Sequence, residues 1–211
     1  MNDLSHPTQD IGNSAPYSLA IKYLTAIFWL GLATLIVTLI TWLPIPDGWA
    51  AWVKRAFNMG TILCLFLLTP VNLRYRKSAF FRAANFCCAI LNLFISSSLF
   101  SLFVGLIALL LSIAACWQLY RAHAELISAH SEKLARNWRR LFWWELILSV
   151  IATAISAASY ILVSVLPQAA FTILSVLSAT ASWIIVILNT VLTVISLIFL
   201  FLTVKLLKQQ T

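Results

Sequence analysis

The chain has 211 residues, of which 62% are hydrophobic and only 9% charged, and its formal net charge is +8. Soluble domains are typically about 45–50% apolar and about 25% charged. The composition therefore excludes a soluble globular enzyme, a disordered chain and a disulfide-stapled secreted module, and it predicts an all-α polytopic integral membrane protein.

The N-terminal residues 1–18 are polar and contain two prolines and a glycine. Such a segment buries too little apolar surface to offset the entropy lost on ordering, so we expect a flexible tail. Signal peptides begin with a basic region before a short apolar core. The tail instead carries Asp3 and Asp10, so we expect no cleaved signal peptide.

Residues 19–208 are predicted to form a single transmembrane helical domain. A helix needs about 20 apolar residues to cross the hydrocarbon core, and six stretches approach or exceed that length. The apolar run 79–120 is too long for one span, and the serines at 96–98 provide a plausible turn that divides it. The predicted spans are 23–43, 57–73, 79–95, 100–121, 141–166 and 185–204.

Three connecting segments need an interpretation. Residues 47–57 suggest a short interfacial helix on the outer side. The basic segment 121–140 is predicted to continue the preceding helix into the cytoplasm and to return through a second short helix.

For the apolar stretch 169–204, a single helix of about 54 Å would exceed the bilayer with its headgroups. We favour a span at 185–204 that is preceded by a segment 169–183 lying at the interface or packing against the bundle, with Trp183 at the boundary; two spans or one long helix are the alternatives.

The positions of Lys and Arg predict the orientation. With six spans and a cytoplasmic N-terminus, twelve of the fourteen basic residues lie on the inner face, where they are favoured. Only Lys54 and Arg55 lie outside. A seventh span would move Lys205 and Lys208 to the outer side, so we expect six spans and both termini in the cytoplasm.

The same charge distribution predicts the surroundings of the protein. The basic inner face indicates orientation and contact with anionic lipids of the inner leaflet, rather than binding to nucleic acid. We expect the plasma (inner) membrane of a bacterium.

The cysteines and histidines do not form a recognisable metal site. All four cysteines lie in predicted spans without a CxxC spacing, and we expect small buried hydrophobic side chains. His123 and His130, with Glu125 and Glu132 nearby, could form a weak metal site or pH sensor, but a solvated charged face is the favoured interpretation. No metal and no cofactor are expected.

Glu145 is the one acidic residue near membrane depth, where a carboxylate is costly unless it is paired. Arg82 and the nearby Arg140 are the predicted partners. Asn85 and Asn92 share a helix face with Arg82 and must point toward protein or a water-filled cavity. We predict an intramembrane polar or ion-pair site, which is either structural or a path for protons or ions, from Glu145, Arg82, Asn85 and Asn92.

Small hydroxyl-bearing residues recur at helical spacing in the last two predicted spans. Such faces allow close helix packing within the bundle, in a homo-oligomer or against a membrane-protein partner. The predicted packing face consists of Ser149, Thr153, Ser156, Ser175, Ser178 and Ser182.

The sequence contains no Walker loop, GxGxxG, HExxH or GxSxG motif. The favoured function is a non-enzymatic accessory, scaffold or assembly component that uses the basic loop and the small-residue faces. A small-solute or ion transporter or channel is the first alternative, using the polar stripe and Glu145. A membrane-embedded lipid-modifying enzyme is the second.

Overall fold

The computed structural model describes residues 14–42, 48–94, 98–165 and 168–209. Within these ranges, the side chains at 14–16, 98–99 and 102 and at most positions from 156 to 178 are not described. The described residues form six helices and no strand: α1 (Ser14–Ile40), α2 (Gly48–Leu67), α3 (Leu73–Leu91), α4 (Ser98–Ile127), α5 (Glu132–Val165) and α6 (Gln168–Lys208).

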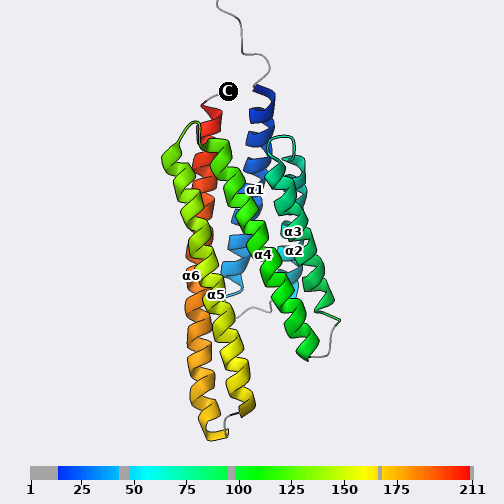
Figure 1. Cartoon of the computed structure of the whole chain (residues 1–211), viewed down its shortest axis with the longest axis vertical. Helices are drawn as coiled ribbons and strands as arrows, with labels where there is room; N and C mark the ends of the chain where they lie inside the picture. Colours follow the sequence, from blue (N-terminus) through cyan, green and yellow to red (C-terminus); the bar gives the residue numbers. More distant parts are fainter. Residues whose placement is uncertain (1–13, 43–47, 95–97, 166–167, 210–211) are drawn as a thin grey trace, which may run out of the picture.

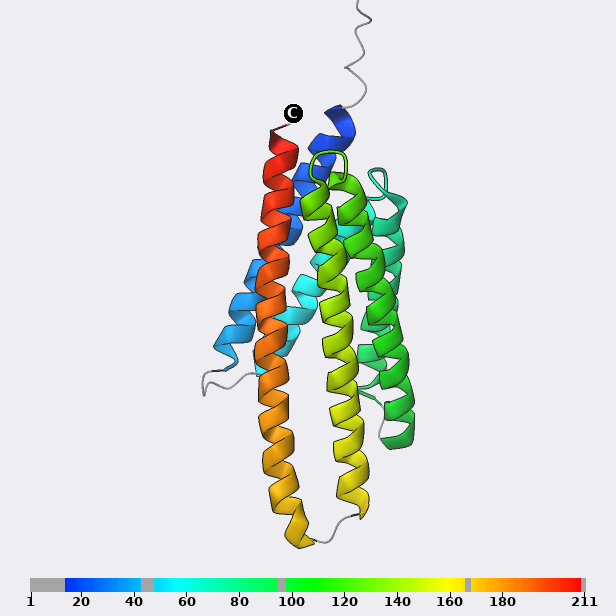
Figure 2. The ribbon, with the colours of Figure 1, turned by 60° about the vertical axis from the view of Figure 1, so that its left-hand side comes forward.

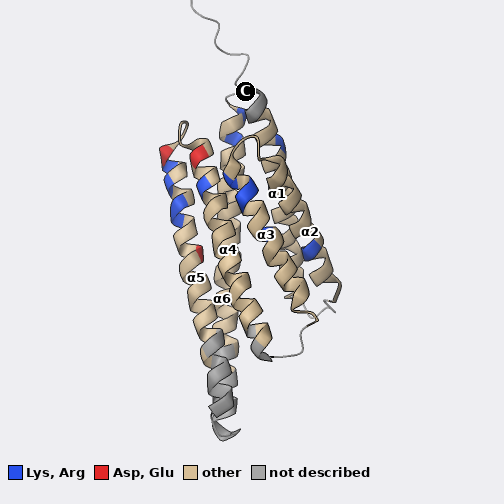
Figure 3. Ribbon diagram, turned by 45° about the vertical axis from the view of Figure 1, so that its right-hand side comes forward, with Lys and Arg blue, Asp and Glu red and all other residues tan. Residues whose placement is uncertain are grey.

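The helices form a closed ring. Each helix packs against its neighbours in the chain, and α1 also packs against α6, while a smaller contact joins α4 to α6. The beginning of α1 and the end of α6 lie at the same end of the bundle (Figure 1). Most Lys and Arg side chains gather toward this end, which we call the basic end (Figure 3).

Four helices are long and apolar enough to cross a membrane. The candidate spans are Tyr17–Ile40, Gly48–Leu67, Phe103–Ile127 and Ala179–Lys208. Large apolar side chains such as Trp29, Phe80 and Leu110 are exposed on the outside of the bundle, where a bilayer would cover them. α3 and α5 begin with charged segments and are not among these four candidates, so the chain has six helices and four clear candidate spans.

α1 begins earlier than predicted. The tail was expected to extend to residue 18, but α1 starts at Ser14, so the prediction is wrong for residues 14–18. Pro16 is compatible with this start because the first helical turn needs no backbone N–H donor. Residues 1–13 lie outside the described part of the chain.

α2 and α3 also differ from their predicted bounds. The short interfacial helix predicted at 47–57 is instead the first half of α2, because no proline occurs between Gly48 and Leu67 and a helix tolerates the single internal glycine, Gly60. Pro70 lies in the turn that follows. Asn72 then caps α3, since its side chain accepts a hydrogen bond from the Arg74 amide at 2.9 Å.

The basic segment 121–140 is divided between two long helices. α4 continues to Ile127 as predicted, and a turn at residues 128–131 leads into α5. Ser131 caps α5 by accepting a hydrogen bond from the Leu134 amide at 3.3 Å. No separate short helix exists here, because α5 runs without a break from Glu132 to Val165. The serines predicted to separate α3 from α4 lie partly outside the described residues.

α6 is one continuous helix of 41 residues, about 61 Å long. Both the favoured interfacial segment and the two-span alternative for residues 169–204 are therefore wrong. Trp183 contacts Trp42 just beyond the end of α1, with 6.3 Å between the ring centroids. The part of α6 that precedes Trp183 extends about 22 Å farther, and Figure 2 shows α5 and α6 reaching well beyond α1 and α2.

A polar cavity between the six helices

A cavity of about 330 Å³ lies between the helices and is lined by side chains from all six. The closed ring explains its position, because each helix turns one face toward the centre. On α2, for example, Lys54, Asn58 and Thr61 follow one another at spacings of four and three residues. The lining residues are Ile27, Gly31, Thr34, Lys54, Asn58, Thr61, Arg82, Leu119, Tyr120, His123, Trp138, Glu145, Thr193, Ser196, Leu197 and Leu200.

Glu145 lies on the α5 side of the cavity and accepts a short hydrogen bond from the Tyr120 hydroxyl of α4. Ser196 of α6 lines the same cavity. The carboxylate is therefore held by the Tyr120 hydroxyl of the neighbouring helix α4.

The predicted ion pairs of Glu145 are not formed. The ion pairs in the described part of the chain join Glu125 to Arg74 and Arg121, and Glu132 to Arg136. Arg140 is exposed and lies five residues before Glu145, which places the two side chains about 140° apart around α5. Arg82 lines the same cavity as Glu145 without pairing with it.

Arg82 is the cation on the α3 side of the cavity. Its Nε atom is buried and has no hydrogen-bond partner among the described residues. Arg82 as a whole is half-buried, but a buried donor without an acceptor is costly, so its Nε–H has unused capacity to donate to an acceptor within the cavity.

Lys54 and Arg55 were predicted to lie on the outer side of the membrane, which stays a prediction. Both side chains are half-buried, but the Arg55 guanidinium stacks on Trp52 at 4.7 Å from the ring centroid, whereas Lys54 lines the cavity. The cavity thus contains two permanent cations, Lys54 and Arg82, against one carboxylate. Sequence reasoning missed Lys54, although its spacing from Asn58 and Thr61 was a usable signal.

The cavity ends toward the basic end in a layer of packed aromatic side chains. His123 is 2% exposed and Trp138 is 1% exposed, and their rings lie 4.5 Å apart. His123 Nδ1 is 3.0 Å from the Tyr75 hydroxyl, and Trp138 donates to Thr203 Oγ1 at 3.1 Å. The expected solvated face is therefore wrong for His123, which is fully packed.

The other polar residues of interest lie outside this layer. His130 is half-buried, and the edge of its ring packs against Tyr17. Among the described residues, no group of three or more His, Cys, Asp and Glu side chains could hold a metal ion. Cys87 is exposed and the other three cysteines are half-buried.

The remaining predicted site residues do not line the cavity. Asn85 is half-buried on α3. Asn92 follows the end of α3, where its Oδ1 atom lies 3.4 Å from the Ser101 hydroxyl. Of the predicted polar stripe, Arg82 alone faces the cavity with Glu145.

The predicted packing face is described only in part. Ser149 and Thr153 are half-buried, and the Thr153 hydroxyl donates to the Ser149 carbonyl within α5 at 2.8 Å. Ser182 is exposed. The side chains of Ser156, Ser175 and Ser178 lie outside the described residues, so this face stays a prediction.

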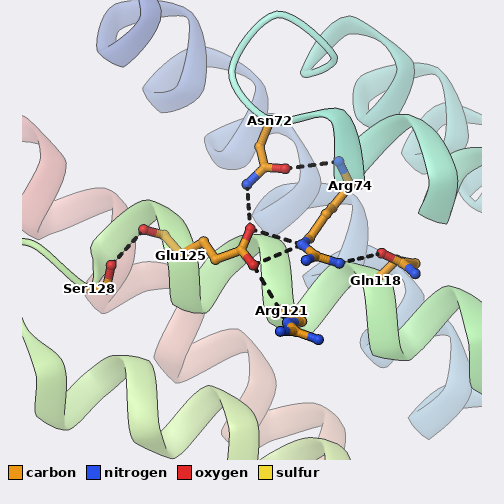
Figure 4. A network of polar contacts seen from close by, with 6 residues as sticks. All are labelled: Asn72, Arg74, Gln118, Arg121, Glu125 and Ser128. Carbon is orange, nitrogen blue, oxygen red and sulfur yellow. Dashed lines mark hydrogen bonds and ion pairs between the residues drawn. The ribbon is translucent and has the colours of Figure 1, made fainter.

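Glu125, also expected on a solvated face, organises a polar network at the basic end (Figure 4). Arg74 contacts both of its carboxylate oxygens, at 2.8 and 2.9 Å, and Asn72 donates to it at 3.1 Å. Arg74 also donates to Gln118 at 3.0 Å, and Arg121 lies 3.5 Å from Glu125. The network ties the beginning of α3 to the end of α4.

Comparisons with protein-family models, curated proteins and solved structures found no match.

Proposed function

We propose that the protein is an integral membrane carrier or channel for a small anionic solute, with six spans and both termini in the cytoplasm. The observation that carries this proposal is the central cavity, in which Lys54, Arg82 and Glu145 face one another from three helices. Concave sites with a few convergent polar groups are typical of small-molecule binding.

The charges of the cavity favour an anion. Two cations and one carboxylate leave an excess of one positive charge, and the carboxylate is already bound by Tyr120. The buried Nε atom of Arg82 has no partner within the described residues. The side chains of Asn58 on α2 and Ser196 on α6 line the same space, whereas the hydroxyls of Thr34 and Thr61, which also line it, donate to carbonyl oxygens of their own helices.

A role in solute passage is favoured over an accessory or scaffold role because of how the basic segment is folded. Residues 121–140 are parts of α4 and α5 rather than a free loop, and two of their basic residues, Arg121 and Arg136, pair with Glu125 and Glu132. The polar groups that converge instead lie between the helices. Ionisable residues within a membrane bundle commonly mark substrate or ion pathways. The proposal includes no enzymatic step.

The first experiment measures binding. The melting temperature of the purified protein in mild detergent is recorded with sodium acetate, sodium glutamate or sodium phosphate, and with choline chloride and glycerol as cationic and neutral controls. At least one of the three anions should raise the melting temperature of the wild type, and Arg82→Gln should remove that rise.

Arg76→Gln is the matched control, because Arg76 is exposed on the same helix. Arg82→Lys keeps the charge and should keep part of the effect. The stabilising anion is then tested for uptake into liposomes that contain the protein. Equal stabilisation of the wild type and Arg82→Gln, or no stabilisation by any of the anions, would contradict the proposal.

A further inference from the structure

A second pocket, of about 300 Å³, lies between α4 and α5 near the basic end. Its lining includes Trp117 and Arg121 from α4, and Arg139, Phe142 and Trp143 from α5. Tyr120, Ala124 and Glu125 complete the lining. Binding at this pocket does not depend on what the central cavity binds.

The order of these side chains follows from helix spacing and direction. Trp117 and Arg121 are four residues apart on α4, and Arg139 and Trp143 are four residues apart on α5, so each pair shares one helix face. α4 runs toward the basic end and α5 runs away from it. Both arginines are therefore nearer the basic end, and both tryptophans lie one turn deeper in the bundle.

The two arginines leave positive charge available in the pocket. The Arg121 guanidinium lies over the Trp117 ring, 5.4 Å from its centroid, and 3.5 Å from Glu125. The Glu125 carboxylate, however, is bound more closely by Arg74 at 2.8 Å. Arg139 is exposed and forms no ion pair within the described part of the chain.

We propose that this pocket binds one anionic glycerophospholipid of the inner leaflet, with its phosphate at Arg121 and Arg139. Arginine is well suited to phosphate because its planar guanidinium can donate two hydrogen bonds at once. Trp117, Phe142 and Trp143 form an apolar wall for the glycerol and the upper acyl chain, at the depth that tryptophan prefers. On both helices the arginine lies nearer the basic end and the tryptophan lies one turn deeper. This order matches the phosphate and the acyl chain of a lipid.

The test uses the full chain in phosphatidylcholine nanodiscs prepared with and without phosphatidylglycerol. Retained lipids are counted by native mass spectrometry, and the affinity for phosphatidylglycerol is measured by its effect on the melting temperature. The variant Arg121→Gln/Arg139→Gln should bind phosphatidylglycerol about 30-fold more weakly, since each basic residue near an anionic surface contributes about a fivefold change in affinity. Arg139→Gln alone should show about a fivefold loss, and it breaks no ion pair among the described residues.

The matched control is Lys22→Gln/Lys133→Gln, which removes the same charge from exposed positions in the first turns of α1 and α5, the parts of these helices that lie toward the basic end. This variant should retain the wild-type affinity. An equal loss in both double variants would indicate general attraction to the charged surface and would overturn the proposal. Displacement of phosphatidylglycerol by inorganic phosphate at matched ionic strength would assign the pocket to a free anion and would also overturn it.

Discussion

At the scale of single residues, the central cavity depends on which groups bind Glu145. A carboxylate between helices must be stabilised by donors or cations, and the Tyr120 hydroxyl on the neighbouring helix provides one such donor. This arrangement leaves Arg82 and Lys54 without an ion pair to Glu145 in the described part of the chain. The two cations are consequently available to a ligand.

The first prediction compares Tyr120→Phe with Glu145→Gln. Tyr120→Phe removes the donor from a charged acceptor and should lower the free energy of unfolding by about 1.5–3 kcal/mol. Glu145→Gln keeps an acceptor for the Tyr120 hydroxyl and should cost less. Unfolding in mixed detergent micelles measures both, and the double variant should cost less than the sum of the two. Equal small effects from both single variants would show that the hydrogen bond contributes little.

The second prediction concerns the layer of aromatic side chains between the cavity and the basic end. Thr203→Val removes the acceptor of the buried Trp138 N–H at nearly constant volume, and an unsatisfied buried donor costs about 1–3 kcal/mol. Thr180→Val is the control, because Thr180 is exposed and its hydroxyl donates to the Val176 carbonyl of its own helix. The melting temperature should fall for Thr203→Val and stay within error for Thr180→Val. A similar fall in both would contradict a specific role for the Trp138 hydrogen bond.

At the scale of the helices, the contact between α1 and α6 closes the ring and depends on a glycine. A Cβ atom added at Gly31 would lie 2.8 Å from Cδ2 of Leu197, whereas one added at Gly105 would meet nothing within 4 Å. Gly31 therefore allows a close approach of α6 to α1, next to the cavity that both helices line.

The third prediction follows from this difference between the two glycines. Both substitutions by alanine gain helix propensity, but Gly31→Ala must displace the Leu197 side chain. Gly31→Ala should therefore be less stable than Gly105→Ala by about 1–3 kcal/mol. Melting temperatures of both variants in the same detergent provide the measurement. If Gly31→Ala is as stable as Gly105→Ala, Leu197 adjusts freely and the close approach does not limit the packing.

At the scale of the whole molecule, the sequence predicts six long helices in the observed order and the gathering of Lys and Arg at one end, although the separate short helices predicted at 47–57 and within 121–140 do not exist. Both features depend on local hydropathy and charge, which are readable in one chain. The continuity of α5 and α6 was missed because it depends on the absence of a breaker and on tertiary contacts such as that between Trp42 and Trp183.

The cavity was predictable only in part. Glu145 and Arg82 stand out as charges in apolar surroundings, so both were identified. The roles of Tyr120 and His123 were not, because side-chain partners between helices depend on the rotation of each helix in the bundle. The position of Lys54 on the cavity wall was missed for the same reason.

The fourth prediction tests the six-span topology. In a variant without the native cysteines, Gly48→Cys should react with a membrane-impermeant maleimide in intact cells. His130→Cys and Gln209→Cys should react only after the cells are permeabilised, since the turn between α4 and α5 and the end of α6 lie at the basic end, which the proposed topology places in the cytoplasm. Labelling of Gln209→Cys in intact cells would contradict the cytoplasmic C-terminus.

The contact between α1 and α6 also determines when the protein can become complete during synthesis. The first helix leaves the ribosome long before the last. The contact between α1 and α6 therefore cannot form while α2 to α5 are still being translated. During this interval Lys54 and Arg82 face an incomplete bundle with one side open to lipid. Assembly of the cavity is thus a late event of translation, and a chain that stops before α6 would enter the membrane with its buried charges unprotected and become a substrate for quality-control proteolysis.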